Sequence, residues 1–283
     1  MNQRGLVLVL SMLLAACGGD DGDGTASNPF GPSGGGKGGS GAQNGSGGAI
    51  QIGTGGAAAS GSGAGAGAGG AGNDLCGSTL TGTIRDFKAS HPDFEYKIEV
   101  DPGIVLPDLG GDGKPQYAGQ SGNPTTTGKS AFDEWFRDSA QSQKKLHSIQ
   151  LTNASGNVWT YNNNAFFPID GQLFGNEGNS HNYHFSFELH TKFIYTGGEV
   201  FTFTGDDDLF VYVNGKLGID LGGVHGAMNA SIDLDANASK LGISKGNVYP
   251  LDFFFAERHT SESNFRIDTT IGTFVDCGPP PVR

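Results

Sequence analysis

Three adjacent carboxylates, Asp206, Asp207 and Asp208, stand between two segments that have the alternating pattern of β-strands. Neighbouring like charges repel one another, so the triplet disfavours strand pairing and favours a polar turn. A solvated acidic turn needs no ligand. Hard oxygen ligands gathered at the end of a strand are, however, what Ca²⁺ requires. The residues alone therefore leave two interpretations open, a plain acidic turn and a calcium site.

The segments on either side of the triplet predict how it is held. Residues 201–204 precede it, and residues 209–213 follow it with a run of apolar and aromatic side chains. Asn214 and Gly215 come next, and Asn-Gly supplies the two positive-φ positions of a tight primed turn. Residues 216–221 then complete a β-hairpin. The carboxylates are thus predicted at the start of a hairpin strand.

The rest of the sequence predicts a fold made mostly of short strands. In residues 183–193, Phe185, Phe187 and Leu189 alternate with polar side chains, as a half-buried strand requires. Further strands are expected at 80–87, 145–153, 158–162, 200–204, 231–235, 248–257 and 265–274. One helix is expected near residue 130, where Ser130 and Asp133 resemble a capping box. The predicted fold class is all-β, a β-sandwich or compact barrel with one short helix.

Several motifs together resemble the fibro-slime domain. They are HPDFE (91–95), FFPIDG (166–171), HNYHF (181–185), GDDDLFVYVNGK (205–216), IDLGGVHG (219–226), LDFFFAERHT (251–260) and SNFR (263–266). The resemblance covers nearly all of residues 80–272. The fibro-slime domain is in turn similar to the lectin-like domain named after anthrax protective antigen, which also occurs in yeast flocculins and bacterial glycosidases. That wider family is a β-sandwich, so the resemblance implies the same fold class.

The resemblance also implies a set of site residues. In sugar-binding members, two consecutive aspartates joined by a cis peptide bind one Ca²⁺, which holds vicinal sugar hydroxyls. Counting back from the hairpin places Asp206 and Asp207 at these positions. Asp208 stands where the family often has glycine, so the pair used could shift by one. A further metal ligand in flocculins corresponds to Glu257, whose alternative role is an ion pair with Arg258 or Arg266.

Other side chains are expected near the ligand or have competing explanations. The expected ligand-binding residues are Asn214, His225 and His259. Zinc is a weaker alternative, because no pair of the four candidate histidines has metalloprotease spacing; they are His181, His184, His225 and His259. A Gly-Asp turn at 108–113 could hold a second calcium or be a plain turn. Trp159 and Tyr161 could stack on a sugar, although alternate strand aromatics usually belong to a core.

The amino-terminal region predicts a lipoprotein. One basic residue precedes an apolar run at 6–16, which is too short to span a bilayer and ends before Cys17. Residues 1–16 are therefore predicted to be a signal peptide, with lipid attached to Cys17. Residues 17–73 are mostly Gly, Ala and Ser, so they are expected to form a disordered tether. The expected location is the outer membrane, lipid-anchored, and more often at the cell surface than at the periplasmic face.

The remaining chain is expected to form one domain at 74–277, followed by a short tail at 278–283. Cys76 and Cys277 stand at its two ends, and in an oxidising compartment they are expected to pair; the alternative is two free thiols. The net charge of −12 makes nucleic acid an unlikely partner and leaves the lipid anchor as the only expected membrane contact.

The expected function is calcium-dependent recognition at the cell surface, with carbohydrate or a matrix glycoconjugate as the partner. The alternative is a structural surface or matrix protein in which calcium only stabilises the fold and contacts are made with proteins. An enzyme is not expected, because no nucleophile–base pattern, phosphate loop or cofactor fingerprint is present.

Overall fold

The computed structural model describes residues 77–119 and 124–276. The chain divides into two units, residues 1–66 and 67–283, and the described residues belong to the second. Its strands are β1 (Thr79–Asp86), β2 (Glu99–Val100), β3 (Gln143–Gln150), β4 (Thr152–Ser155), β5 (Val158–Asn163), β6 (Phe185–Tyr195), β7 (Val200–Gly205), β8 (Asp208–Val213), β9 (Lys216–Leu221), β10 (Gly223–Val224), β11 (Met228–Asp233), β12 (Asn247–Glu257), β13 (Phe265–Thr269) and β14 (Phe274–Val275). Its helices are α1 (Lys129–Glu134) and α2 (Leu234–Leu241).

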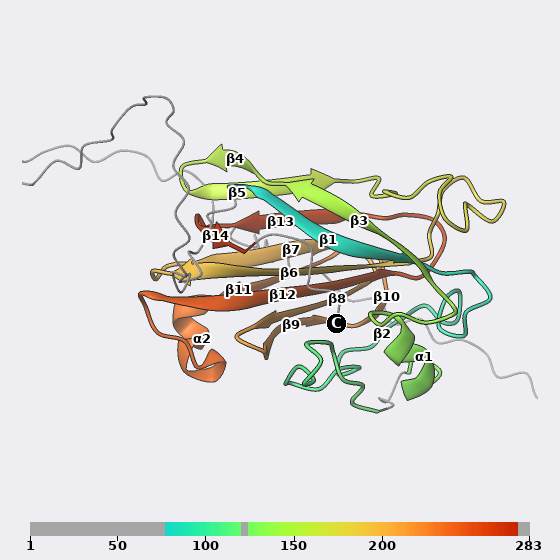
Figure 1. The fold of residues 1–283 in the computed structure, drawn as a ribbon, viewed down its shortest axis with the longest axis horizontal. Coiled ribbons are helices and arrows are strands. Elements are labelled where there is room, and N and C mark those ends of the chain that lie inside the picture. Colours follow the sequence, from blue (N-terminus) through green and yellow to red (C-terminus); the bar gives the residue numbers. More distant parts are fainter. Residues whose placement is uncertain (1–76, 120–123, 277–283) are drawn as a thin grey trace, which may run out of the picture. The chain divides into compact units, whose positions relative to one another are not determined.

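The strands form two main antiparallel sheets, which confirms the predicted all-β sandwich. The larger sheet has the order β3-β1-β6-β12-β8-β9, and β14 pairs with β6. The second sheet has the order β11-β7-β13-β5-β4, and β2 and β10 form a separate pair. Figure 1 shows the strands of both sheets running in nearly the same direction, with α1, β2 and β10 near one end of them and α2 near the other.

Two apolar clusters cover opposite faces of the larger sheet. Successive side chains of a strand point to opposite faces, so β12 serves both clusters. Phe253 and Phe255 belong to the main core, together with Phe203 of β7 and Phe265 of β13 from the second sheet. Phe254 points the other way, into a second aromatic cluster. The larger sheet is therefore buried on both faces.

The second cluster lies beneath α1 and the long connection before it. Phe132, Trp135 and Phe136 are fully buried there against the outer face of the larger sheet. The predicted helix is confirmed, but the predicted capping box is wrong. Gly128 is the N-cap and makes no side-chain cap, so Ser130 lies inside the helix.

The predicted hairpin turn is confirmed. Asn214 and Gly215, between β8 and β9, have φ angles of 52° and 72°, as a primed turn requires. A second helix was not predicted. Asp233 ends β11 and caps α2, where its side chain accepts a hydrogen bond from the Ala236 N–H at 2.9 Å. The strand expected at 231–235 therefore ends two residues early.

No helix among the residues that the structure describes is long and apolar enough to cross a membrane. The predicted signal peptide, Cys17, the tether at 17–73, Cys76, Cys277 and the tail at 278–283 lie outside the described residues. Lipid attachment and the disulfide therefore stay predictions.

Candidate metal centre

The acidic triplet lies where strands of both sheets meet. Asp206 and Asp207 connect β7 of the second sheet to β8 of the larger sheet, and the peptide bond between them is cis. The residue before them, Gly205, faces the start of β13: a Cβ there would lie 2.1 Å from the Asn264 carbonyl oxygen. Only glycine allows this approach, because any side chain would force the two backbones apart.

Asp206 is fixed by one neighbouring residue. Its carboxylate accepts hydrogen bonds from the backbone N–H of Asn264 and, at 3.1 Å, from the Asn264 side-chain amide. Only 3% of Asp206 is exposed. Burial raises the pKa of Asp206 above its ordinary value, although the bonds from Asn264 act in the opposite direction.

Asp207 accepts two backbone hydrogen bonds from segments far away in sequence. One oxygen accepts from the His225 N–H at 3.2 Å, and the other accepts from the Arg258 N–H at 3.0 Å. Burial, followed by the charge of Asp208, raises the pKa of Asp207 to about 7. The carboxylate is therefore oriented by the backbone but is not neutralised by it.

Glu257, the last residue of β12, carries the least satisfied carboxylate of the site. It is fully buried, and neither carboxylate oxygen has a hydrogen-bond partner of regular geometry among the described residues. The Ser263 hydroxyl and the His259 backbone are close enough to lower its pKa, but neither makes a hydrogen bond of regular geometry with it. Burial first, and then the charges of Asp207 and Asp206, raise the pKa of Glu257 well above its ordinary value.

Asp208 has a different role from its two neighbours. Its side chain is fully buried, and one oxygen pairs with Nε of Arg258 at 2.6 Å while the other accepts from the Gly223 N–H at 2.6 Å. The Arg258 guanidinium also lies over the Trp135 ring, 4.6 Å from its centroid. Asp208 thus differs from Asp206 and Asp207 in having an ion-pair partner, the Arg258 guanidinium, among the described residues.

The alternative role predicted for Glu257 is not seen. Arg258 pairs with Asp208, and Arg266 pairs with Asp268 at 2.6 Å. Among the residues that the structure describes, no ion pair involves Asp206, Asp207 or Glu257. These three carboxylates are thus buried close enough to act on one another without forming an ion pair among the described residues, although the charge of Arg258 lowers the pKa of Asp207.

The two predicted histidines flank this cluster. The backbone of His225 binds Asp207, and its buried Nε2 has no hydrogen-bond partner among the described residues. His259 lies two residues after Glu257 and pairs through Nε2 with Glu95 at 3.1 Å. Glu95 also accepts from the Thr260 N–H at 2.8 Å. Both histidines therefore lie at the rim of the site.

The structure does not bring Asn214, a predicted ligand-binding residue, together with the carboxylates. This residue follows the last residue of β8, whereas Asp206 and Asp207 precede its first residue. Six strand residues separate them by roughly 20 Å. The Asn214 amide instead donates to the carbonyl oxygens of Leu241 and Gly242, at 3.0 and 3.3 Å. It fastens the hairpin turn to the end of α2.

The other candidate residues have the following partners in the structure. His181 stacks on Phe167 and binds Asp170. In the 108–113 turn, Asp112 binds Arg137 at 2.8 Å. Trp159 packs against the main core, as Tyr161 does. Over the described ranges, no group of three or more His, Cys, Asp or Glu side chains has an arrangement that could hold a metal ion.

Sequence reasoning missed Asn264 and the role of Arg258. The signal for Arg258 was present, because a buried arginine next to an acidic cluster needs a carboxylate partner. Nothing in the local sequence announces that Asn264 binds Asp206, since the contact depends on how β13 pairs with β7.

A family model and curated relatives match this chain. Residues 153–273 match the model of the PA14 domain, and this stretch includes all three carboxylates. Protein psiD of Dictyostelium discoideum is 38% identical over 221 residues, which cover 70% of this chain and 43% of psiD. Protein psiR of the same organism is 37% identical over 212 residues, which cover 66% of this chain and 21% of psiR. The chain thus spans less than half of each relative.

Solved structures give more distant similarities. The PA14 domain of the antifreeze protein MpAFP has a TM-score of 0.30 and 11% identity, covering 67% of this chain and 80% of that domain. The PA14 sugar-binding domain from an RTX adhesin has a TM-score of 0.31 and 10% identity, covering 69% of this chain and 90% of that domain.

Proposed function

We propose that this protein is a calcium-dependent carbohydrate-binding module. The observation that carries the proposal is the buried group of Asp206, Asp207 and Glu257, in which both Glu257 oxygens lack a regular hydrogen-bond partner. Burying an unpaired carboxylate is costly, and buried charges are normally paired or coordinate metals. A divalent cation supplies the missing compensation.

These residues fit Ca²⁺ by their chemistry. All three offer hard carboxylate oxygens, and calcium accepts six to eight oxygen ligands in flexible geometry. Asp206, Asp207 and Glu257 would hold the ion, with backbone carbonyls and water as further ligands. The bound ion would offer a positive centre to vicinal hydroxyls. The three carboxylates would hold the ion and neutralise its charge.

Carbohydrate is supported as the partner by the family. The carboxylates fall inside the stretch that matches the PA14 domain, and Asp206 and Asp207 occupy the positions that bind calcium in sugar-binding members of the resembling family. His225 and His259 at the rim are placed to contact a sugar held by the ion. The identity of the sugar depends on the surrounding loops.

Calorimetry with Ca²⁺ tests the metal half of this proposal. We expect the full chain to bind one calcium, and Asp207→Asn to weaken binding by at least tenfold, because the amide keeps the shape of the side chain but removes its charge. Asp276→Asn is the matched control, since Asp276 is exposed and pairs with Lys192 at the surface. Equal affinity for all three proteins would overturn the proposal.

A glycan array tests the carbohydrate half. We expect binding in calcium, and loss of binding both in a chelator and in Asp207→Asn. A protein that binds calcium normally but no glycan would support the second candidate, in which calcium only stiffens the fold. That candidate is favoured by the burial of the carboxylates, which are 3%, 4% and 0% exposed.

We also propose that the module is not an enzyme and is displayed from the outer membrane through lipid on Cys17. Metabolic labelling with a fatty-acid probe tests the anchor. Labelled wild-type protein and unlabelled Cys17→Ser support it, whereas labelling of both would contradict it.

A further inference from the structure

A cleft lies between α1 and the long connection that precedes it. It has a volume of about 340 Å³, within the range of small-molecule sites. One wall comes from a hairpin-like loop in which Val105 pairs with Tyr117; this wall includes Leu106, Gly111 and Gln116. The other wall comes from Lys129, Asp133 and Arg137. None of these residues belongs to the calcium site.

The charges that line this cleft cancel one another. Lys129, Asp133 and Arg137 stand four residues apart, so they follow one face of α1 and its extension. Lys129 pairs with Asp133 at 2.5 Å, and Arg137 pairs with Asp112 at 2.8 Å. Two cations therefore balance two carboxylates. The cleft has no net charge that would select an anion or a cation.

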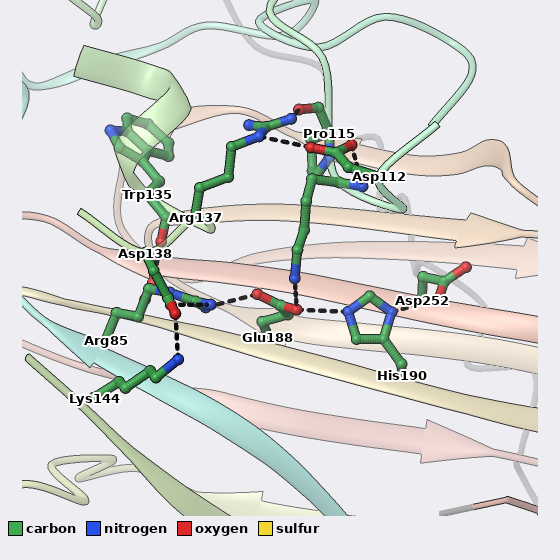
Figure 2. A network of polar contacts seen from close by, with 12 residues as sticks. Arg85, Asp112, Pro115, Trp135, Arg137, Asp138, Lys144, Glu188, His190 and Asp252 are labelled. Atoms are coloured by element: carbon green, nitrogen blue, oxygen red, sulfur yellow. Dashed lines mark hydrogen bonds and ion pairs between the residues drawn. The ribbon is translucent and has the colours of Figure 1, made fainter. Parts of the chain in front are cut away.

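The loop wall is fastened to the sheet beneath it. Lys114, two residues after Asp112, pairs with Glu188 of β6, whose side chain is fully buried. Figure 2 shows Glu188 between Arg85 and His190, and Asp252 on the far side of His190. The Arg85 and His190 contacts with Glu188 measure 2.6 and 2.7 Å.

This network remains charged at neutral pH. Burial alone would raise the pKa of Glu188, but the hydrogen bond from His190 and the charges of Arg85 and Lys114 lower it to about 2. The loop is also tied to the other wall, because Arg137 donates to the Pro115 carbonyl oxygen at 3.1 Å. Both walls are thus held before any ligand arrives, which reduces the ordering cost of binding.

We propose that this cleft is a second, calcium-independent binding site for a neutral saccharide. A ligand hydroxyl can donate to Asp133 Oδ1, which is buried without a hydrogen-bond partner among the described residues. Arg137 and Asp112 stay engaged with each other and keep the walls in place. Tyr117 and Leu106 give the cleft an apolar portion for the C–H face of a sugar ring. A neutral, hydroxyl-rich ligand uses both kinds of group without disturbing the charge balance.

The test uses the full chain in a chelator, so that the calcium site is inactive. The probes are methyl glycosides of glucose, galactose, mannose and xylose at millimolar concentration, followed by amide shifts and saturation transfer in NMR. Gly111→Trp fills the cleft, because a Cβ on Gly111 meets no atom within 4 Å. Gly272→Trp is the matched control, since Gly272 is equally open and lies outside the cleft.

We expect at least one glycoside to shift amides of residues 110–117 and 129–137 in the wild type, Gly272→Trp and Asp207→Asn. Gly111→Trp should lose this response at least tenfold while keeping its fold and any calcium binding. The proposal is overturned if no glycoside shifts these amides, or if Gly111→Trp responds like the wild type. Binding that requires calcium and Asp207 would also overturn it, while leaving the proposed function intact.

Discussion

At the scale of single residues, the four buried acidic side chains of the site differ in how far cations and hydrogen bonds offset their charges. Asp208 has a guanidinium partner, and Asp206 and Asp207 have hydrogen bonds from N–H groups. Glu257 has no partner of regular geometry among the described residues. Because the cost of an uncompensated charge is highest there, Glu257 is the residue whose neutralisation should change the metal-free protein most.

We therefore predict that Glu257→Gln stabilises the calcium-free protein and weakens calcium binding. Removing an unpaired buried charge should raise the free energy of unfolding in a chelator by about 1–3 kcal/mol. The measurement is urea unfolding, with and without calcium. Glu262→Gln serves as the control, because Glu262 is exposed near the same site. A destabilised Glu257→Gln in chelator would contradict this explanation.

The raised pKa of Asp207 predicts the pH dependence of the metal-free protein. Its folded-state pKa is about 7, against an ordinary value of 3.8. The folded state therefore binds the proton more tightly than the unfolded chain does. This contribution to stability is complete below about pH 4 and is lost as the pH rises through 7, by about 1.4 kcal/mol per pH unit.

Thermal unfolding in chelator between pH 4 and 8 measures this effect. Asp207→Asn should show a flatter profile, and calcium should reverse the slope of the wild type. A wild-type stability that rises from pH 4 to 7 without calcium would be incompatible with the prediction.

At the scale of elements, the Arg258–Asp208 pair joins the end of β12 to the start of β8. Arg258 also donates to the Thr125 carbonyl oxygen at 2.7 Å, so it ties the connection before α1 to the larger sheet. We predict that Arg258→Met destabilises the protein by about 3–5 kcal/mol, because it leaves Asp208 buried and unpaired. Chemical unfolding checks this value, and Arg266→Met, at an exposed ion pair, should cost less than 1 kcal/mol.

Helix α2 shows where local sequence patterns were insufficient. Residues 231–235 alternate as a strand does, yet Asp233 caps a helix instead. We predict that Asp233→Ala costs about 1 kcal/mol of stability, whereas Asp233→Asn costs little, because asparagine keeps an acceptor for the Ala236 N–H. Thermal melts of the two variants make this comparison; equal losses would argue against a capping role.

Most strands could be predicted because alternation and the Asn-Gly turn are local signals. The acidic triplet and Glu257 could be identified in the same way, with the help of a family resemblance. The different hydrogen-bond and ion-pair partners of Asp206 and Asp208 could not be predicted, since these partners, Asn264 and Arg258, are distant in sequence. Asn214 belongs to the same sequence motif as the carboxylates, so it was expected near them. In the structure the length of β8 separates Asn214 from them.

At the scale of the whole molecule, the predicted Cys76–Cys277 bridge would join the two ends of the domain. A loop of about 200 residues closed by this bond corresponds to roughly 4–5 kcal/mol in the chain-entropy model. We expect mass spectrometry of non-reduced peptides to find the linked pair, and reduction to lower the thermal midpoint. Free thiols at both positions in secreted protein would contradict the bridge.

The central claim is that Asp206, Asp207 and Glu257 together bind one calcium ion. A high-resolution crystal structure grown in millimolar calcium, with anomalous data, tests it most directly. The account predicts a single anomalous peak roughly 2.3–2.6 Å from oxygens of all three side chains. The claim would be contradicted if the map showed only ordered water beside these carboxylates under the same calcium concentration.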